Sequence, residues 1–168
     1  MYLGIDPGAG GAICSLRFTP AGKAIIFFHA LPNSKVTIHD SMAFIKATQV
    51  DSIIYCGGRL TVAVEDVHSL PNMTAKSNFS FGYNLGTVHT MLESLGITFS
   101  TVQPKKWQKK TGIVFPKGTD PKNRKIITAT QATTIYPDAQ IYGPRGGLLD
   151  GRADALMIAH YLHLENTP

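Results

Sequence analysis

The sequence predicts a single α/β domain with a mixed β-sheet, spanning residues 1–168. Short apolar runs, which are typical of strands, crowd the first third of the chain, and further short apolar runs then alternate with longer segments of helical periodicity. No internal repeat, low-complexity tract or linker divides the sequence. A chain of this length can bury a core without cross-links, and the alternation favours a sheet with helices packed against it.

The first third predicts three strands, over residues 2–6, 11–18 and 23–31. Pro7-Gly8 separates the first two, and the segment 19–22, which contains Pro and Gly, separates the second from the third. Turn signals between such closely spaced strands favour a three-stranded antiparallel meander.

Helices and strands alternate over the rest of the chain. Ile38, Met42 and Ile45 lie at helical intervals and predict a helix over residues 36–50. Pro104 suits the first turn of a short helix. We expect two further strands over residues 61–65 and 97–102, and further helices over about 79–95, 104–110, 121 to just before Tyr136, and 150–164.

The composition excludes several classes of protein. No apolar stretch is long enough to span a membrane, and the N-terminus lacks the pattern of a signal peptide. Cys14 and Cys56 lie in apolar stretches without metal-ligand neighbours, which argues against a disulfide framework or a zinc site. We therefore expect a cytoplasmic protein with no membrane partner.

The formal net charge of +5 is concentrated in one segment. The stretch from Thr101 to Lys125 contains a single acid, Asp120, while the remainder holds more acidic than basic residues. A basic segment beside an acidic remainder predicts a polyanionic partner, although a solvated lysine-rich face is the alternative. Its basic residues are Lys105, Lys106, Lys109, Lys110, Lys117, Lys122, Arg124 and Lys125.

Four acidic residues stand where the predicted elements could bring them together. The first strand ends in Asp6 and the strand after the first helix ends in Glu65, and such strand ends line the usual crevice of α/β sheets. Asp150 and Asp154 are four apart and share one face of the last helix. Each also has a local explanation: an Asx-turn for Asp6, an ion pair with a lysine for Glu65, an N-cap for Asp150 and the helix dipole for Asp154.

A cluster of these carboxylates would form a site of hard oxygen ligands, which suits Mg²⁺ or Mn²⁺. Two such ions activate water for attack on a phosphodiester and stabilise the leaving oxygen, with 5′-phosphate and 3′-hydroxyl products. The basic segment would hold the phosphate backbone. The residues thus predict a two-metal nuclease without a side-chain nucleophile.

Five segments resemble the RuvC Holliday-junction resolvases, in the same order and most closely the compact members found in phages. They are Leu3–Ala12, Val62–Val67, Gly82–Leu92, Val102–Lys110 and Asp150–Leu162. The resemblance implies an RNase H-like fold with a five-stranded mixed sheet, a homodimer, and two Mg²⁺ ions, with Mn²⁺ as a substitute. It also implies paired symmetric nicks across four-way and other branched DNA, no small-molecule substrate, and location in the host cytoplasm if the chain is phage-encoded.

The resemblance assigns Asp6, Glu65 and Asp154 as catalytic metal ligands. The acid expected three residues before Asp154 is replaced by Gly151, so Asp150, four before, is assigned as the fourth ligand. The lysine expected after the P-x-x-hydrophobic motif is Gln108, and Lys109 is the favoured substitute for contact with the scissile phosphate.

The remaining assignments concern DNA contacts and nearby residues. The eight basic residues of 101–125 are expected to contact phosphates, and aromatic side chains after the second acid could stack on unpaired bases. The candidates there are Lys76, Phe79, Phe81 and Tyr83, with the alternative that two of the three aromatic residues belong to the core. Trp107 is predicted to be a core residue, and His160 and His163 to be on the surface. For His68, three residues after Glu65, the sequence leaves open whether it approaches the metals or is incidental.

Three other classes deserve comparison. Actin-like sugar kinases share an Asp-x-Gly turn after a strand but need two such domains, which 168 residues cannot supply. The YqgF-type RNA-processing nucleases share the opening strand and the small size. A catalytically silent nucleic-acid-binding module of the same fold is the third alternative, although retention of all four acids disfavours it.

Overall fold

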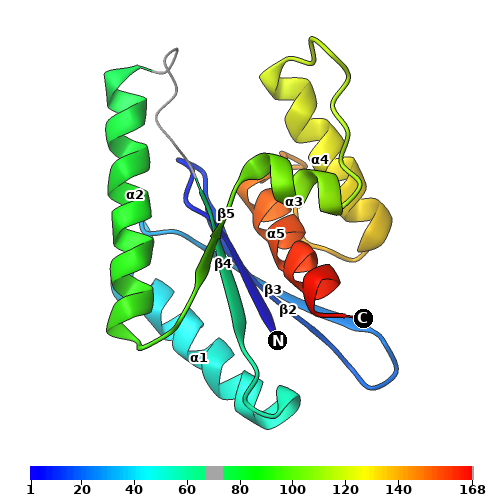
Figure 1. The fold of residues 1–168 in the computed structure, drawn as a ribbon. Coiled ribbons are helices and arrows are strands. Elements are labelled where there is room, and N and C mark those ends of the chain that lie inside the picture. Colours follow the sequence, from blue (N-terminus) through cyan, green and yellow to red (C-terminus); the bar gives the residue numbers. More distant parts are fainter. Residues whose placement is uncertain (67–73, 168) are drawn as a thin grey trace.

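Five strands and five helices make up residues 1–66 and 74–167, the part of the chain that the computed structural model describes (Figure 1). The strands are β1 (Tyr2–Asp6), β2 (Ala12–Phe18), β3 (Ala24–Ala30), β4 (Thr61–Glu65) and β5 (Ser100–Val102). The helices are α1 (Ile38–Cys56), α2 (Ala75–Ser94), α3 (Pro104–Lys110), α4 (Pro121–Ile135) and α5 (Asp150–Asn166).

The strands form one mixed sheet in the order β3-β2-β1-β4-β5. β1, β2 and β3 make the predicted antiparallel meander, whereas β4 and β5 continue the sheet parallel to β1. Ile5 of β1 pairs with Val64 of β4, so the residues that follow them, Asp6 and Glu65, stand at neighbouring strand ends. The predicted α/β class and five-stranded mixed sheet are confirmed.

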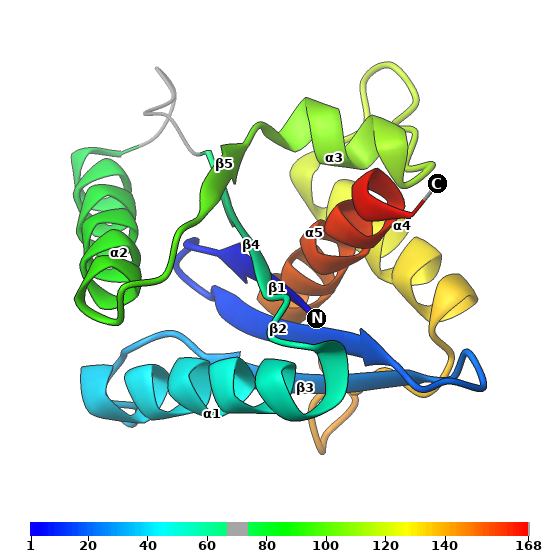
Figure 2. The ribbon, with the colours of Figure 1, turned by 60° about the horizontal axis from the view of Figure 1, so that its bottom comes forward.

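Helices cover both faces of the sheet. α1 and α2 lie on one face, while α3, α4 and α5 lie on the other (Figures 1 and 2). Leu3 and Ile5 of β1 pack with Ile45 and Leu92 in the core on the first face. The second core contains Trp107 and most of the buried side of α5.

α5 packs directly on β1 because a glycine lies at the contact. A Cβ atom at Gly4 would overlap the backbone of Ala155 and Ala159. At the start of α5, a Cβ at Gly151 would overlap the carbonyl oxygen of Gly10 in the turn after β1. These close approaches place the first turns of α5 beside the end of β1.

Three element boundaries differ from the predicted ones by three residues or more. α1 continues to Cys56, although its last turns expose Ile53 and Ile54. The helix ends there because Gly57, with a φ of 60°, caps it. α2 begins at Ala75, where the side chain of Thr74 accepts a hydrogen bond from the backbone N–H of Ser77. β5 begins at Ser100 rather than at residue 97.

Among the described helices, none combines the length and the apolar character that a membrane crossing requires. Cys14 and Cys56 are both unpaired thiols, and burial raises the pKa of Cys14 well above its usual value.

Candidate functional site

The four candidate acids come from three elements that meet at one edge of the sheet. Asp6 and Glu65 end β1 and β4, and Asp150 and Asp154 lie in the first turns of α5. This edge is in the upper part of Figure 1, between α2 on one side and α3 and α5 on the other.

Asp6 is only 7% exposed and takes part both in the turn that follows β1 and in the cluster of four acids. Its Oδ1 accepts a hydrogen bond of 2.8 Å from the backbone N–H of Gly8, which is the Asx-turn considered from the sequence. Burial raises the pKa of Asp6 to about 6; the bond from Gly8 opposes this rise, and the negative charge of Asp150 adds to it. The turn therefore fixes the carboxylate without removing it from the cluster.

Glu65 is held by an indole rather than by a lysine. Nε1 of Trp107 donates a hydrogen bond of 2.9 Å to Oε1 of Glu65. Burial raises the pKa of Glu65 to about 7, the charge of Asp6 adds to the rise, and the bond from Trp107 opposes it. Trp107 is 1% exposed, so the prediction of a core residue is confirmed, but its bond to Glu65 was not foreseen.

Asp154 shows that all four acids interact. Burial raises the pKa of Asp154 well above its usual value, and the charges of Asp6, Glu65 and Asp150 raise it further. Gathered carboxylates that repel one another in this way favour a bound cation.

Asp150 already has a cationic neighbour. It is the first residue of α5, whose N-cap is Leu149, so the N-cap explanation for Asp150 is wrong. Lys125 of α4 forms an ion pair with Oδ2 of Asp150, and the Lys125 charge also lowers the pKa values of Asp6 and Asp154. The resemblance favoured Lys109 for contact with the scissile phosphate, but in the structure it is the Lys125 ammonium that lies beside a candidate acid. Lys109 is exposed on α3 and forms no ion pair with any residue in the described ranges.

The donor set fits a hard divalent cation, because the four residues contribute only carboxylate oxygens. Within residues 1–66 and 74–167, however, no three carboxylate, imidazole or thiol groups are already arranged to hold an ion. Metal binding at this edge would therefore require the carboxylates to move closer together.

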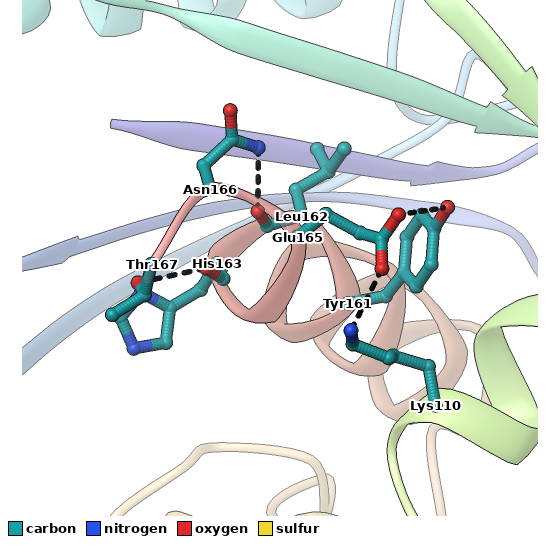
Figure 3. Close-up of polar contacts among 7 residues, drawn as sticks. All are labelled: Lys110, Tyr161, Leu162, His163, Glu165, Asn166 and Thr167. Atoms are coloured by element: carbon teal, nitrogen blue, oxygen red, sulfur yellow. Dashed lines mark hydrogen bonds and ion pairs between the residues drawn. The ribbon is translucent and has the colours of Figure 1, made fainter.

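The basic residues of the segment are all exposed, from Lys105 to Lys125. Some of its charges also hold the structure together. Lys110 pairs with Glu165 at 2.9 Å, where Glu165 also accepts a hydrogen bond from the hydroxyl of Tyr161 (Figure 3). The Arg124 side chain donates to the carbonyl of Thr119. Lys105, Lys106, Lys109, Lys117 and Lys122 are the exposed lysines of the segment without an ion pair among the described residues.

The aromatic side chains of α2 are more exposed than the core alternative predicts. Phe79 is 77% exposed and Tyr83 is 60% exposed, while Phe81 is half-buried and Lys76 is exposed. The alternative that two of the three aromatic side chains belong to the core is wrong. The Asn84 side chain of the same helix donates a hydrogen bond of 3.1 Å to the carbonyl of Gly8, which anchors α2 to the Asp6 turn.

Two histidine expectations have an outcome and one has none. His160 is buried rather than on the surface, because its face of α5 packs against α4, and its Nδ1 lies 2.8 Å from the hydroxyl of Tyr136. His163 is half-buried with its ring against Phe18. His68 lies outside the described residues.

Solved structures of junction resolvases share this fold. The structure of T. thermophilus RuvC in complex with a Holliday junction substrate matches with a TM-score of 0.57 and 17% identity, covering 97% of this chain and 92% of that chain. A second Thermus thermophilus RuvC structure matches with a TM-score of 0.53 and 18% identity, covering 97% of this chain and 93% of that chain. The yeast mitochondrial Holliday junction resolvase Ydc2 matches with a TM-score of 0.50 and 14% identity, covering 97% of this chain and 77% of that chain.

At these identities the likeness establishes the fold, and the predicted RNase H-like fold of the RuvC type is confirmed. No protein-family profile and no curated protein sequence matches the chain.

Proposed function

We propose that the chain is a metal-dependent endonuclease that resolves four-way DNA junctions by paired, symmetric nicks. The observation that carries this proposal is the meeting of four carboxylates and Lys125 at one sheet edge, next to an exposed basic segment, in a fold shared with a junction-bound RuvC.

Asp6, Glu65, Asp150 and Asp154 would hold two Mg²⁺ ions, with Mn²⁺ as a substitute. When bound, the ions supply activation of water and neutralisation of the leaving oxygen, with 5′-phosphate and 3′-hydroxyl products. Asp6 is fixed by its turn and Glu65 by Trp107, so both carboxylates are oriented by the protein. Lys125, once released from Asp150, is the lysine best placed to contact the scissile phosphate.

The exposed lysines of the basic segment would bind backbone phosphates, which gives salt-sensitive affinity with little sequence readout. Phe79 and Tyr83 expose aromatic rings on α2 that could stack on unpaired bases at the junction centre. Symmetric nicks on opposed strands require two active sites, so the proposal includes a homodimer acting in the cytoplasm.

Replacement of Asp6 tests the catalytic part of the proposal. Asp6→Asn should bind a four-way junction but leave it uncut in Mg²⁺, because one ligand charge is lost at the most buried acid. Asp138→Asn, at an exposed acid outside the cluster, is the matched control and should cut like wild type. Without metal, Asp6→Asn should melt no lower than wild type, since it removes a buried charge that its neighbours repel. Undiminished cleavage by Asp6→Asn, or by wild type in excess EDTA, would rule out the proposed site.

A further inference from the structure

The only tryptophan in the chain, Trp107, contacts a candidate metal ligand. An indole N–H donates one hydrogen bond and accepts none, and a buried donor needs an acceptor. If Trp107 served only to fill the core, its N–H could donate to any nearby acceptor, such as a backbone carbonyl. Here the acceptor is Oε1 of Glu65, 42 positions away in the sequence, at 2.9 Å.

The indole is itself held firmly in place. Its ring belongs to the core on the α5 face of the sheet, and the hydroxyl of Thr111 donates to the Trp107 carbonyl at 2.9 Å. The ion pair of Lys110 with Glu165 fastens the end of α3 to α5 (Figure 3). The donor that reaches Glu65 therefore comes from a side chain with little freedom to move.

The two carboxylate oxygens of Glu65 differ in their contacts. Oε1 is engaged by Trp107, and Oε2 has no hydrogen-bond partner among the described residues. A fixed bond to one oxygen limits rotation of the carboxylate and leaves the other oxygen available to a cation. Outer partners of this kind orient metal ligands and commonly affect metal affinity.

We infer that Trp107 is a positioning residue for Glu65, whose indole N–H orients the carboxylate so that Oε2 can bind a divalent cation. The inference rests on the proposed function, because it assumes that the acids bind metal. It assigns to a core side chain a role in assembling the metal site.

An isosteric replacement tests the bond without emptying the core. Because the chain has one tryptophan, 3-benzothienylalanine, which carries sulfur in place of the indole N–H, can be incorporated at position 107 alone. Trp107→Phe gives a second, genetically encoded removal of the donor. Tyr136→Phe is the matched control, since it removes a buried hydroxyl bonded to His160 from the same core without touching the acids.

The main measurement is Mn²⁺ affinity, obtained from the free-ion signal in electron paramagnetic resonance, together with the melting temperature and junction cleavage. We expect about tenfold weaker Mn²⁺ binding for the isostere, with a melting temperature close to wild type. The Tyr136→Phe control should bind Mn²⁺ like wild type. In wild type, Mn²⁺ should also quench the Trp107 fluorescence, and Mg²⁺ in excess should restore it.

Wild-type Mn²⁺ affinity in the isosteric protein would overturn the inference and leave the proposed function intact. Conversely, a wild-type chain that binds Mn²⁺ with Trp107-dependent affinity but cuts no junction would support the inference and contradict the proposed function. A wild-type chain that binds no Mn²⁺ would overturn both.

Discussion

At the scale of single residues, Asp6 illustrates how one side chain can satisfy a structural and a chemical requirement together. Its Oδ1 closes the turn after β1 by accepting from Gly8, and its carboxylate stays within the field of Asp150 and Asp154. A carboxylate fixed by a backbone donor needs little reorganisation when a cation arrives. The turn and the metal-ligand explanations of Asp6 are therefore complementary.

Lys125 and Lys109 provide a paired test of which lysine serves the acidic site. Lys125→Met should lower the cleavage rate at saturating protein with little loss of junction affinity, because its ammonium lies beside Asp150. Lys109→Met should mainly weaken junction binding, because Lys109 is exposed on α3. Single-turnover cleavage and filter binding separate the two effects. The opposite pattern would return the role to Lys109.

His160 predicts a pH dependence of stability. Burial, together with the charge of neighbouring His163, lowers its pKa to about 4, whereas an unfolded histidine takes up its proton near 6.5. Between these values the unfolded chain binds more protons, so this contribution to the unfolding free energy falls as the pH drops from about 6.5 to about 4. We expect a loss of roughly 1–3 kcal/mol over this window.

The pH prediction is tested by comparing variants, because the raised pKa values of the acids act in the opposite direction. Denaturant unfolding of His160→Gln should show a shallower loss of stability below pH 6.5 than wild type. The control is His39→Gln, at an exposed position on α1. A difference between wild type and His160→Gln that stays constant across this range would contradict the assignment.

At the scale of elements, the contact of α5 with β1 sets the geometry of the acids. Gly4→Ala should destabilise the chain by about 1–3 kcal/mol, because the new methyl group would overlap helix backbone that cannot move aside. Gly82→Ala on α2, where the added atom meets open space, should be neutral or stabilising by up to about 1 kcal/mol. Urea unfolding measures both, and equal stability of Gly4→Ala and wild type would disprove close packing of α5 on β1.

The elements could largely be predicted because their signals are local. Short apolar runs located β1 and β4, and Pro104 and Pro121 marked the starts of α3 and α4. Helix ends were missed where the signal was a cap rather than a periodicity. Thr74 begins α2 and Gly57 ends α1, and neither belongs to the apolar pattern that defined these helices.

At the scale of the whole molecule, four of the eleven acidic residues gather at one sheet edge while the excess positive charge lies on α3, α4 and the loop between them. The net charge of +5 understates this separation. The gathering of these four acids could be predicted from the strand ends and from the first turns of the last helix, while their binding of metal stays a prediction. The bonds from Trp107 to Glu65 and from Lys125 to Asp150 join residues far apart in sequence, so only the packing of α3 and α4 against α5 reveals them.

The most direct test of the account is one metal-dependent cleavage assay on four substrates: a four-way DNA junction, a Y-fork, linear duplex DNA and an RNA/DNA hybrid, with structured ribosomal RNA as a further arm. The account predicts symmetric nicks in the four-way junction in Mg²⁺ or Mn²⁺, no cleavage in EDTA, and little cleavage of linear duplex. Equal cleavage of junction and duplex would contradict junction selectivity. Preferential cleavage of RNA would favour an RNA-processing nuclease, and junction binding without any cleavage would indicate a silent binding module.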